Sequence, residues 1–197
     1  KNEDGNTPLH LACQFGAPLE VMFSLLQVWP DATKEKDLIH GRTPLQKSCC
    51  RRVPWEVVAP LEEVAALLQV WPDAVKEKDR RGYSPLHCAC RSRASLQATT
   101  LLLNTWLGYK ENTTKSQIMA LQPLQGEDFY FTGDVEVLFS HLFALCNNNT
   151  DNHYPKETID YFIRIELWNG VALVLDKNPT LIPAVIKTEG LDTKVMA

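Results

Sequence analysis

LLQVWPDAVKEKD, residues 67–79, occurs almost unchanged earlier in the chain as LLQVWPDATKEKD, residues 25–37. The two copies differ only where Val75 replaces Thr33, and they lie 42 positions apart. Agreement over this length is far beyond chance, and a period of a few tens of residues is typical of proteins built from stacked repeats. We therefore predict that the fold rests on an internal repeat.

A second shared element precedes each copy and occurs a third time. Its three versions are GNTPLHLAC (5–13), GRTPLQKSC (41–49) and GYSPLHCAC (82–90). After each version comes a leucine and, ten residues later, a tryptophan. The leucines are Leu19, Leu61 and Leu96, and the tryptophans are Trp29, Trp71 and Trp106. The chain therefore contains three repeat units, which we place at residues 1–37, 38–79 and 80–109.

Each unit has the pattern of two helices. A Thr or Ser before a proline is typical of a helix start, because the hydroxyl caps free backbone N–H groups and the proline has none to satisfy. In the second half of each unit, apolar residues recur at the spacing of one helix face. Pro30 and Pro72 then end the second helices of the first two units. The sequence predicts an all-α chain of helix–turn–helix units.

The arrangement G-x-[TS]-P-L-H, followed by a small residue, a leucine-rich helix and a charged loop, resembles the ankyrin repeat over roughly residues 1–109. The resemblance implies a solenoid in which the Thr or Ser hydroxyl and the following His form a hydrogen-bond network at the turn into the first helix. Gln46 departs from this pattern, and the loops after the second helices are longer than usual for the family. The residues that match the signature are Thr7, Pro8, His10, Thr43, Pro44, Ser84, Pro85 and His87.

The three repeated tryptophans are predicted to pack between neighbouring units. A Trp side chain buries roughly 150–250 Å², which is worth on the order of 4–6 kcal/mol as an upper bound. Stacked repeats also need a continuous core between neighbours. We therefore favour inter-repeat packing over an aromatic ligand cage for Trp29, Trp71 and Trp106.

Beyond residue 109 the repeat signature is absent. Residues 110–133 are polar and broken by proline and glycine, which is typical of a connector. Helical periodicity returns over residues 134–197. Because a terminal repeat needs cover for its exposed side, we expect a helical cap here, with a small separate helical domain as the alternative. The chain starts without Met and inside a repeat, so we expect a truncated piece of a longer protein.

The composition is that of a globular protein, with 45% hydrophobic residues and a net charge of −4. No apolar run approaches the roughly 18 residues of a membrane span, and the first residues lack the apolar core of a signal peptide. We therefore expect an intracellular, cytoplasmic location and no membrane partner. Residues 1–109 carry 13 basic against 12 acidic side chains, a balance that does not favour nucleic-acid binding.

The six cysteines are expected to be free structural thiols. Cys13, Cys49 and Cys90 hold the same place in the three units, where a small apolar side chain is needed, and no zinc-ligand spacing is present. The sequence also lacks a phosphate-binding glycine loop and a nucleophile elbow. We therefore expect no enzyme activity, no catalytic residue, no metal and no cofactor.

Repeat two carries six extra residues between its helices, in the stretch RRVPWEVVAP (51–60). Insertions in repeat arrays lie in loops and often on the binding face, and Trp beside Arg is the composition of an interface hot spot. Two further arginines follow the first helix of unit three, and two others lie in the loop before it. The candidates for partner contact are Trp55, Arg51, Arg52, Arg80, Arg81, Arg91 and Arg93. The alternatives are that Trp55 covers its own repeat and that the arginines form a solvated face balanced by nearby glutamates.

These features predict a non-catalytic protein–protein interaction scaffold that presents a concave ankyrin surface to a protein partner, an acidic one where the arginines make contact. The alternative is a structural or regulatory module that packs against another domain of the same longer chain. Arrays of this kind share a scaffold and not a ligand, so the sequence does not identify the partner.

Overall fold

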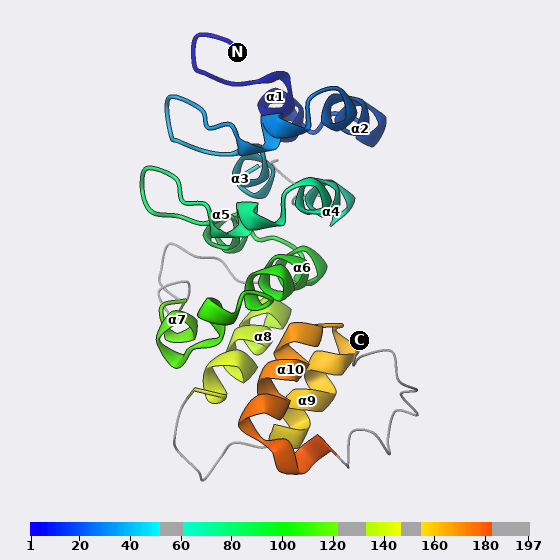
Figure 1. Cartoon of the computed structure of the whole chain (residues 1–197), viewed down its shortest axis with the longest axis vertical. Coiled ribbons are helices and arrows are strands. Elements are labelled where there is room, and N and C mark those ends of the chain that lie inside the picture. Colours follow the sequence, from blue (N-terminus) through cyan, green and yellow to red (C-terminus); the bar gives the residue numbers. More distant parts are fainter. Residues whose placement is uncertain (52–60, 122–132, 147–154, 183–197) are drawn as a thin grey trace.

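The structure is a computed structural model of the whole chain, and it describes residues 1–51, 61–121, 133–146 and 155–182. These residues form helices, turns and loops, and no strand occurs among them. The first part of the chain contains three helix pairs that stack in one direction (Figure 1). The pairs are α1 (Pro8–Phe15) with α2 (Leu19–Val28), α3 (Pro44–Cys49) with α4 (Leu61–Val70), and α5 (Pro85–Arg91) with α6 (Leu96–Leu107). The predicted all-α, ankyrin-type solenoid is confirmed.

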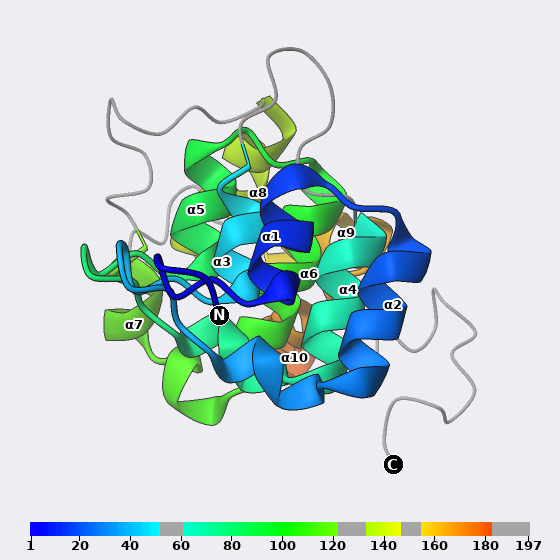
Figure 2. The same ribbon diagram turned by 90° about the horizontal axis from the view of Figure 1, so that it is seen from above.

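The helix pairs form two layers. The first helices, α1, α3 and α5, lie one below the other, and the second helices, α2, α4 and α6, form a parallel row beside them (Figures 1 and 2). Each helix contacts both its partner and its counterpart in a neighbouring pair. The long loops between pairs project on the side away from the second helices (Figure 1). The loop tips and the first helices therefore share one side of the array.

Capping determines where the first helices begin. The side chains of Thr7, Thr43 and Ser84 each accept a hydrogen bond from the backbone N–H three residues later, and each is followed by a proline. α1 ends at Phe15 and is capped by Gly16, whose φ of 69° lies in the left-handed region that favours glycine at a helix C-terminus. All three starts agree with the sequence prediction.

The three tryptophans that are predicted to pack between units are buried to different extents. Trp29 is 38% exposed, Trp71 is partly buried and Trp106 is 9% exposed. Because Pro30 and Pro72 directly follow the first two tryptophans, α2 and α4 end before them. No proline follows Trp106, so α6 continues through it and carries its side chain into the core.

A continuous apolar core runs through the three pairs. One position of the first helix holds a buried cysteine in every repeat, and another holds a buried leucine. These residues are Cys13, Cys49 and Cys90, and Leu9, Leu45 and Leu86. Burying each leucine contributes about 1.5–3 kcal/mol, and the small cysteines let neighbouring helices approach closely.

The helices after the array pack against its last pair (Figure 1). α8 and α10 contact α6, and α7 contacts α8. Asn169 joins these helices to the array. Its backbone N–H donates to Oδ1 of Asn104 in α6 and its side-chain amide donates to the carbonyl of Asn104, both at 2.8 Å. The elements are η3 (Lys110–Thr113), α7 (Lys115–Met119), α8 (Gly133–Ala144), α9 (Pro155–Arg164), α10 (Trp168–Lys177) and η5 (Pro179–Leu181). Helices outside the array therefore cover the side of α6 that has no following repeat.

Candidate protein-binding surface

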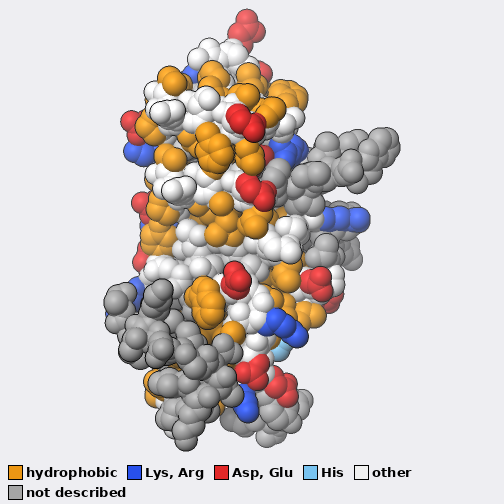
Figure 3. All heavy atoms as spheres, turned by 90° about the vertical axis from the view of Figure 1, so that its right-hand side faces the viewer, with side chains coloured by type: hydrophobic (Ala, Val, Ile, Leu, Met, Phe, Trp, Pro, Cys, Tyr) orange, Lys and Arg blue, Asp and Glu red, His pale blue; other side chains and the backbone are white. Residues whose placement is uncertain are grey.

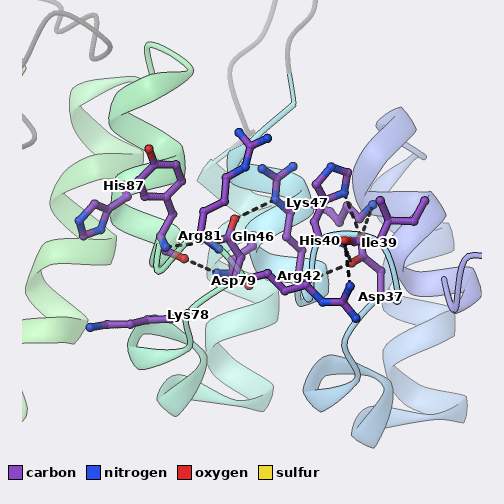
Figure 4. A network of polar contacts seen from close by, with 12 residues as sticks. Asp37, Ile39, His40, Arg42, Gln46, Lys47, Lys78, Asp79, Arg81 and His87 are labelled. Carbon is purple, nitrogen blue, oxygen red and sulfur yellow. Dashed lines mark hydrogen bonds and ion pairs between the residues drawn. The ribbon is translucent and has the colours of Figure 1, made fainter.

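A buried aspartate organises the loop between the first two helix pairs. Asp37 accepts hydrogen bonds from the backbone N–H groups of His40 and Arg42 at 2.8 and 3.1 Å (Figure 4). Its second carboxylate oxygen lies 2.7 Å from Nζ of Lys47. Burial by itself would raise the pKa of Asp37, but the bonds from Lys47 and from the two amides outweigh it and hold the pKa below its ordinary value. The carboxylate is therefore ionised and fully engaged inside the loop.

Asp79 has the same role in the next loop. It accepts hydrogen bonds from the backbone N–H groups of Arg81 and Tyr83, both at 2.9 Å. Nε of Arg42, from the preceding loop, lies 3.3 Å from its other oxygen (Figure 4). The last residue of the repeated KEKD thus shapes each loop, a role that the sequence reasoning missed although the identity of this residue in both copies pointed to it.

Backbone hydrogen bonds join the loop tips into one continuous edge. The N–H of Leu38 donates to the carbonyl of Asp4, and the N–H of Arg80 donates to the carbonyl of His40, both at 2.8 Å. The loops approach so closely that a Cβ added at Gly41, where φ is 68°, would lie 3.0 Å from Cγ of Arg80. Glycine is needed there both for the left-handed backbone and for the space.

His10 holds the turn into α1 through both ring nitrogens. Nδ1 accepts the backbone N–H of Thr7 at 3.2 Å, and Nε2 lies 3.0 Å from the carbonyl oxygen of Arg42 in the next loop. Because Nδ1 is an acceptor, the proton is assigned to Nε2, which donates to Arg42. His87 accepts the N–H of Ser84 in the same way. Burial lowers the pKa of His10 and His87 and keeps both rings neutral, so the network implied by the family resemblance is present.

Gln46 replaces the histidine in repeat two and preserves its contacts. Its Oε1 accepts the backbone N–H of Thr43 at 2.9 Å, and its Nε2 donates to the carbonyl of Tyr83 at 2.7 Å. A side-chain amide offers one acceptor and one donor end, as a neutral imidazole does. The residue that departs from the signature therefore still ties its helix to the next loop.

Positive side chains surround the buried Asp79 at the tip of the second loop. Lys78, Arg80 and Arg81 are exposed, whereas Asp79 lies beneath them with its oxygens engaged. The nearby Glu77 pairs with a lysine of the preceding loop at 2.7 Å. The acidic groups next to these cations are therefore already used within the fold, and the tip presents positive charge.

Two more of the predicted cations lie at the far end of α5. Arg91 is half-buried, with its guanidinium 5.8 Å from the centre of the Tyr83 ring. Arg93 is exposed just beyond the helix. α5 has only seven residues, a length of about 10 Å, and the contact of Arg91 with Tyr83 links its far end to the loop before it.

The prediction that Arg51 contacts a partner is contradicted by its burial. Its side chain is only 8% exposed and pairs with Glu63, itself 2% exposed, at 3.2 Å. Arg51 also donates to the backbone carbonyl of Cys13 at 3.3 Å. Burial raises the pKa of Glu63, and the charge of Arg51 works against that rise. Arg51 therefore joins repeats one and two internally, while Arg52 and Trp55 lie outside the described residues.

Metal-ligand clusters and membrane-spanning helices are absent from the described parts of the chain. There, no three His, Cys, Asp or Glu residues lie close enough together to hold a metal ion. No helix in the same ranges is long and apolar enough to cross a bilayer. All six cysteines are free, and five of them are buried. Exposed basic side chains lie at the tip of the second loop and just after α5.

Comparison with protein families agrees with this geometry. The family model for ankyrin repeats in three copies matches residues 9–115, which is more than half of the 197-residue chain. The match runs from α1 through all three helix pairs to the start of α7. No curated protein matches the chain significantly. The comparisons therefore support the scaffold and name no partner.

Proposed function

The chain belongs to the ankyrin repeat family, and we propose that it is a non-catalytic scaffold that binds an acidic segment of a protein partner through repeat three and the loop before it. Ankyrin repeats generally mediate protein–protein interaction. The proposed contact surface, called the cationic patch below, consists of exposed or half-exposed basic residues. They are Lys78, Arg80, Arg81, Arg91 and Arg93.

The observation that carries this proposal is the burial of Asp79 beneath exposed cations. A surface carboxylate at this position would neutralise its neighbours, but Asp79 is turned inward to the loop amides and Arg42. The positive field at the tip is therefore left for an outside ligand. Several like charges on one surface speed association with an oppositely charged partner and select against wrong ones.

The loop that presents the cations is ordered before any partner binds. The backbone N–H of Arg81 is held by Asp79, and that of Arg80 by the carbonyl of His40. The Arg80 guanidinium also donates to the carbonyl of Ile39 at 3.4 Å. Such preorganisation removes part of the ordering cost of binding and favours a defined contact over diffuse charge attraction.

Affinity capture with a charge-reversal variant tests this function. The chain, an Arg80→Glu/Arg81→Glu variant and a Lys110→Glu/Lys156→Glu control would be immobilised and compared by quantitative mass spectrometry, with chemical crosslinks mapped on the bound proteins. Both control lysines are exposed and lie outside the cationic patch. We expect a partner held by the chain and the control, lost by the patch variant, and crosslinked through a segment rich in Asp and Glu.

Salt dependence provides the second readout. Capture through the patch weakens as ionic strength rises from about 0.05 to about 0.5 M, because exposed charges are screened over a few ångströms at high salt. Equal capture by all three proteins, or crosslinks confined to apolar segments of the bound protein, would show that the patch is not the binding site.

A further inference from the structure

Each helix pair has a side that faces the preceding pair, here called its leading face. In α4 this face contains Glu63, Ala66 and Leu67, which share one side of the helix by their spacing and are all buried. The preceding pair covers them, because α4 contacts α2 and the Arg51–Glu63 pair reaches the carbonyl of Cys13. The leading face of the second pair is thus part of the inter-repeat interface.

Several equivalent positions of the first pair are apolar and lack cover. Val21 corresponds to Glu63 and is 44% exposed, and Phe15 corresponds to Arg51 and is 75% exposed. Leu25 corresponds to the fully buried Leu67 and is only partly buried. In the view from above, α1 and α2 lie in front of the other helices (Figure 2), and hydrophobic side chains lie along the side of the array that faces the viewer in Figure 3.

This composition does not suit the outer end of an array. Terminal repeats normally present a polar outer side, which keeps the solenoid soluble, and clustered exposed apolar side chains mark sites of interaction. The covered leading face of the second pair carries the charged residues Arg51 and Glu63, whereas the uncovered face of the first pair carries Phe15 and Val21 at the same positions. The uncovered face is therefore the more apolar of the two.

The loop in front of α1 has the hydrogen bonds of a loop that joins two pairs. The N–H of Asn2 donates to the carbonyl of Asn6 at 3.0 Å, and its side chain accepts the N–H of Asn6 at 2.8 Å. Asp37 makes the same two bonds with Arg42, at 2.9 and 3.1 Å. Asn2 thus takes the place that an aspartate has after a complete helix pair.

Ion pairs between loops show the same correspondence. Lys1 pairs with Glu35, and Lys36 pairs with Glu77 at 2.7 Å. In both cases the lysine directly precedes the loop-forming Asn or Asp. The loop in front of α1 therefore has the register of a loop that follows a helix pair.

From these observations we propose that the leading face of the first pair is a docking surface for another ankyrin-type helix pair. That pair packs its apolar side on Phe15, Val21 and Leu25, in the way that the first pair covers Arg51, Glu63 and Leu67 of the second. The established stacking of α2 on α4 continues into this surface, and the loop of Asn2 is already in the matching conformation. This second interface lies at the opposite end of the array from the C-terminal helices and is separate from the cationic patch.

The chain itself supplies the probe for a test. A copy of residues 1–35 placed directly before Lys1 adds one helix pair. The last residue of the copy is Glu35, so the junction Glu35–Lys1 reproduces the natural Glu35–Lys36 junction of the chain. Val21→Glu would then be introduced into the chain and into the second copy within the extended protein. The matched control is Phe23→Glu, because Phe23 is 52% exposed and its counterpart Ala65 stays exposed even though a pair precedes it.

In the unextended chain we expect both substitutions to change the melting temperature by no more than about 2 °C, as surface changes do. In the extended protein we expect Val21→Glu to lower it by at least about 6 °C while Phe23→Glu remains near neutral. Equal effects of the two substitutions in the extended protein, or separate melting of the added pair, would overturn the proposal. Concentration-dependent dimerisation of the unextended chain that Val21→Glu abolishes would also overturn it, since the occupant would then be a second copy.

Discussion

The side-chain amide of Gln46 donates a 2.7 Å hydrogen bond to the backbone carbonyl of Tyr83 in the next repeat. Nε2 of His10 makes the equivalent contact, at 3.0 Å, to the carbonyl of Arg42 one repeat earlier. Two chemically different side chains therefore hold successive loops against successive first helices. Because the second of these loops carries Lys78, Arg80 and Arg81 of the cationic patch, its attachment links the stability of the array to its proposed function.

Removing the side-chain amide of Gln46 is expected to destabilise the fold. In Gln46→Ala the buried N–H of Thr43 and carbonyl of Tyr83 lose their partners, which should lower the free energy of unfolding by about 2–4 kcal/mol. Gln46→His should retain most of the stability, because a neutral imidazole can make both bonds. Urea denaturation at neutral pH measures both variants, and an alanine variant as stable as the parent chain would refute the role given to Gln46.

The two capping histidines should make the array sensitive to mild acid. Their pKa lies below the ordinary value of 6.5 because burial disfavours the charged ring. Below about pH 6.5 the unfolded chain therefore binds protons that the folded chain does not, and stability falls as the pH decreases towards the folded-state pKa. Above that pH this contribution is fully present.

A His10→Gln/His87→Gln variant, which repeats the solution found at Gln46, isolates this effect. Urea denaturation of both proteins at about pH 7.5 and about pH 5.5 should show that the parent chain loses more stability than the variant over this interval. All carboxylates are common to the two proteins, so their titration cancels in the comparison. An equal loss of stability in the parent chain and the variant would mean that the histidines do not take up protons on unfolding.

Breaking the Arg51–Glu63 pair by one substitution is expected to lower the stability of the fold far more than replacing both residues by apolar ones. Arg51→Ala leaves the Glu63 carboxylate buried without its cation, which should cost about 3–5 kcal/mol. The double substitution Arg51→Met/Glu63→Leu removes both charges and should lie much closer to the parent chain. A double-mutant cycle by chemical denaturation gives the coupling, and additive effects would show that the two side chains do not interact in solution.

The repeated tryptophans should contribute differently to stability, although they occupy equivalent positions in the repeats. Trp106→Ala removes a buried side chain and should cost about 3–5 kcal/mol. Trp29→Ala removes one that is 38% exposed and should cost less than about 2 kcal/mol. Thermal or chemical denaturation distinguishes them, and equal losses would imply that Trp29 is covered in solution.

The helix starts could be read from the sequence because their signals are local. Thr7 and Pro8 act on backbone groups within one turn, and the same pair of signals recurs in each unit. The burial of Trp29 and Trp106 is not determined by their shared position in the repeat. It depends on the residue after each tryptophan, because Pro30 ends α2 before Trp29, whereas Leu107 lets α6 continue through Trp106.

The candidate site was predictable only in part for a similar reason. Arg51 and Arg80 look alike in the sequence, each next to another arginine. Their difference comes from tertiary contacts. Glu63 pairs with Arg51 inside the array, whereas Asp79, the acid beside Arg80, bonds to loop amides and to Arg42. The loop-shaping role of Asp79 likewise depends on amides that approach it only when the loop closes.

The most direct test of the proposed function is the affinity of the captured partner for the chain and for the Arg80→Glu/Arg81→Glu variant, measured by titration at about 0.15 M salt. The cationic patch predicts that Kd rises at least about tenfold in the variant, while the Lys110→Glu/Lys156→Glu control binds as the parent chain does. An unchanged Kd in the patch variant would contradict the proposal that these loop-tip arginines bind the partner.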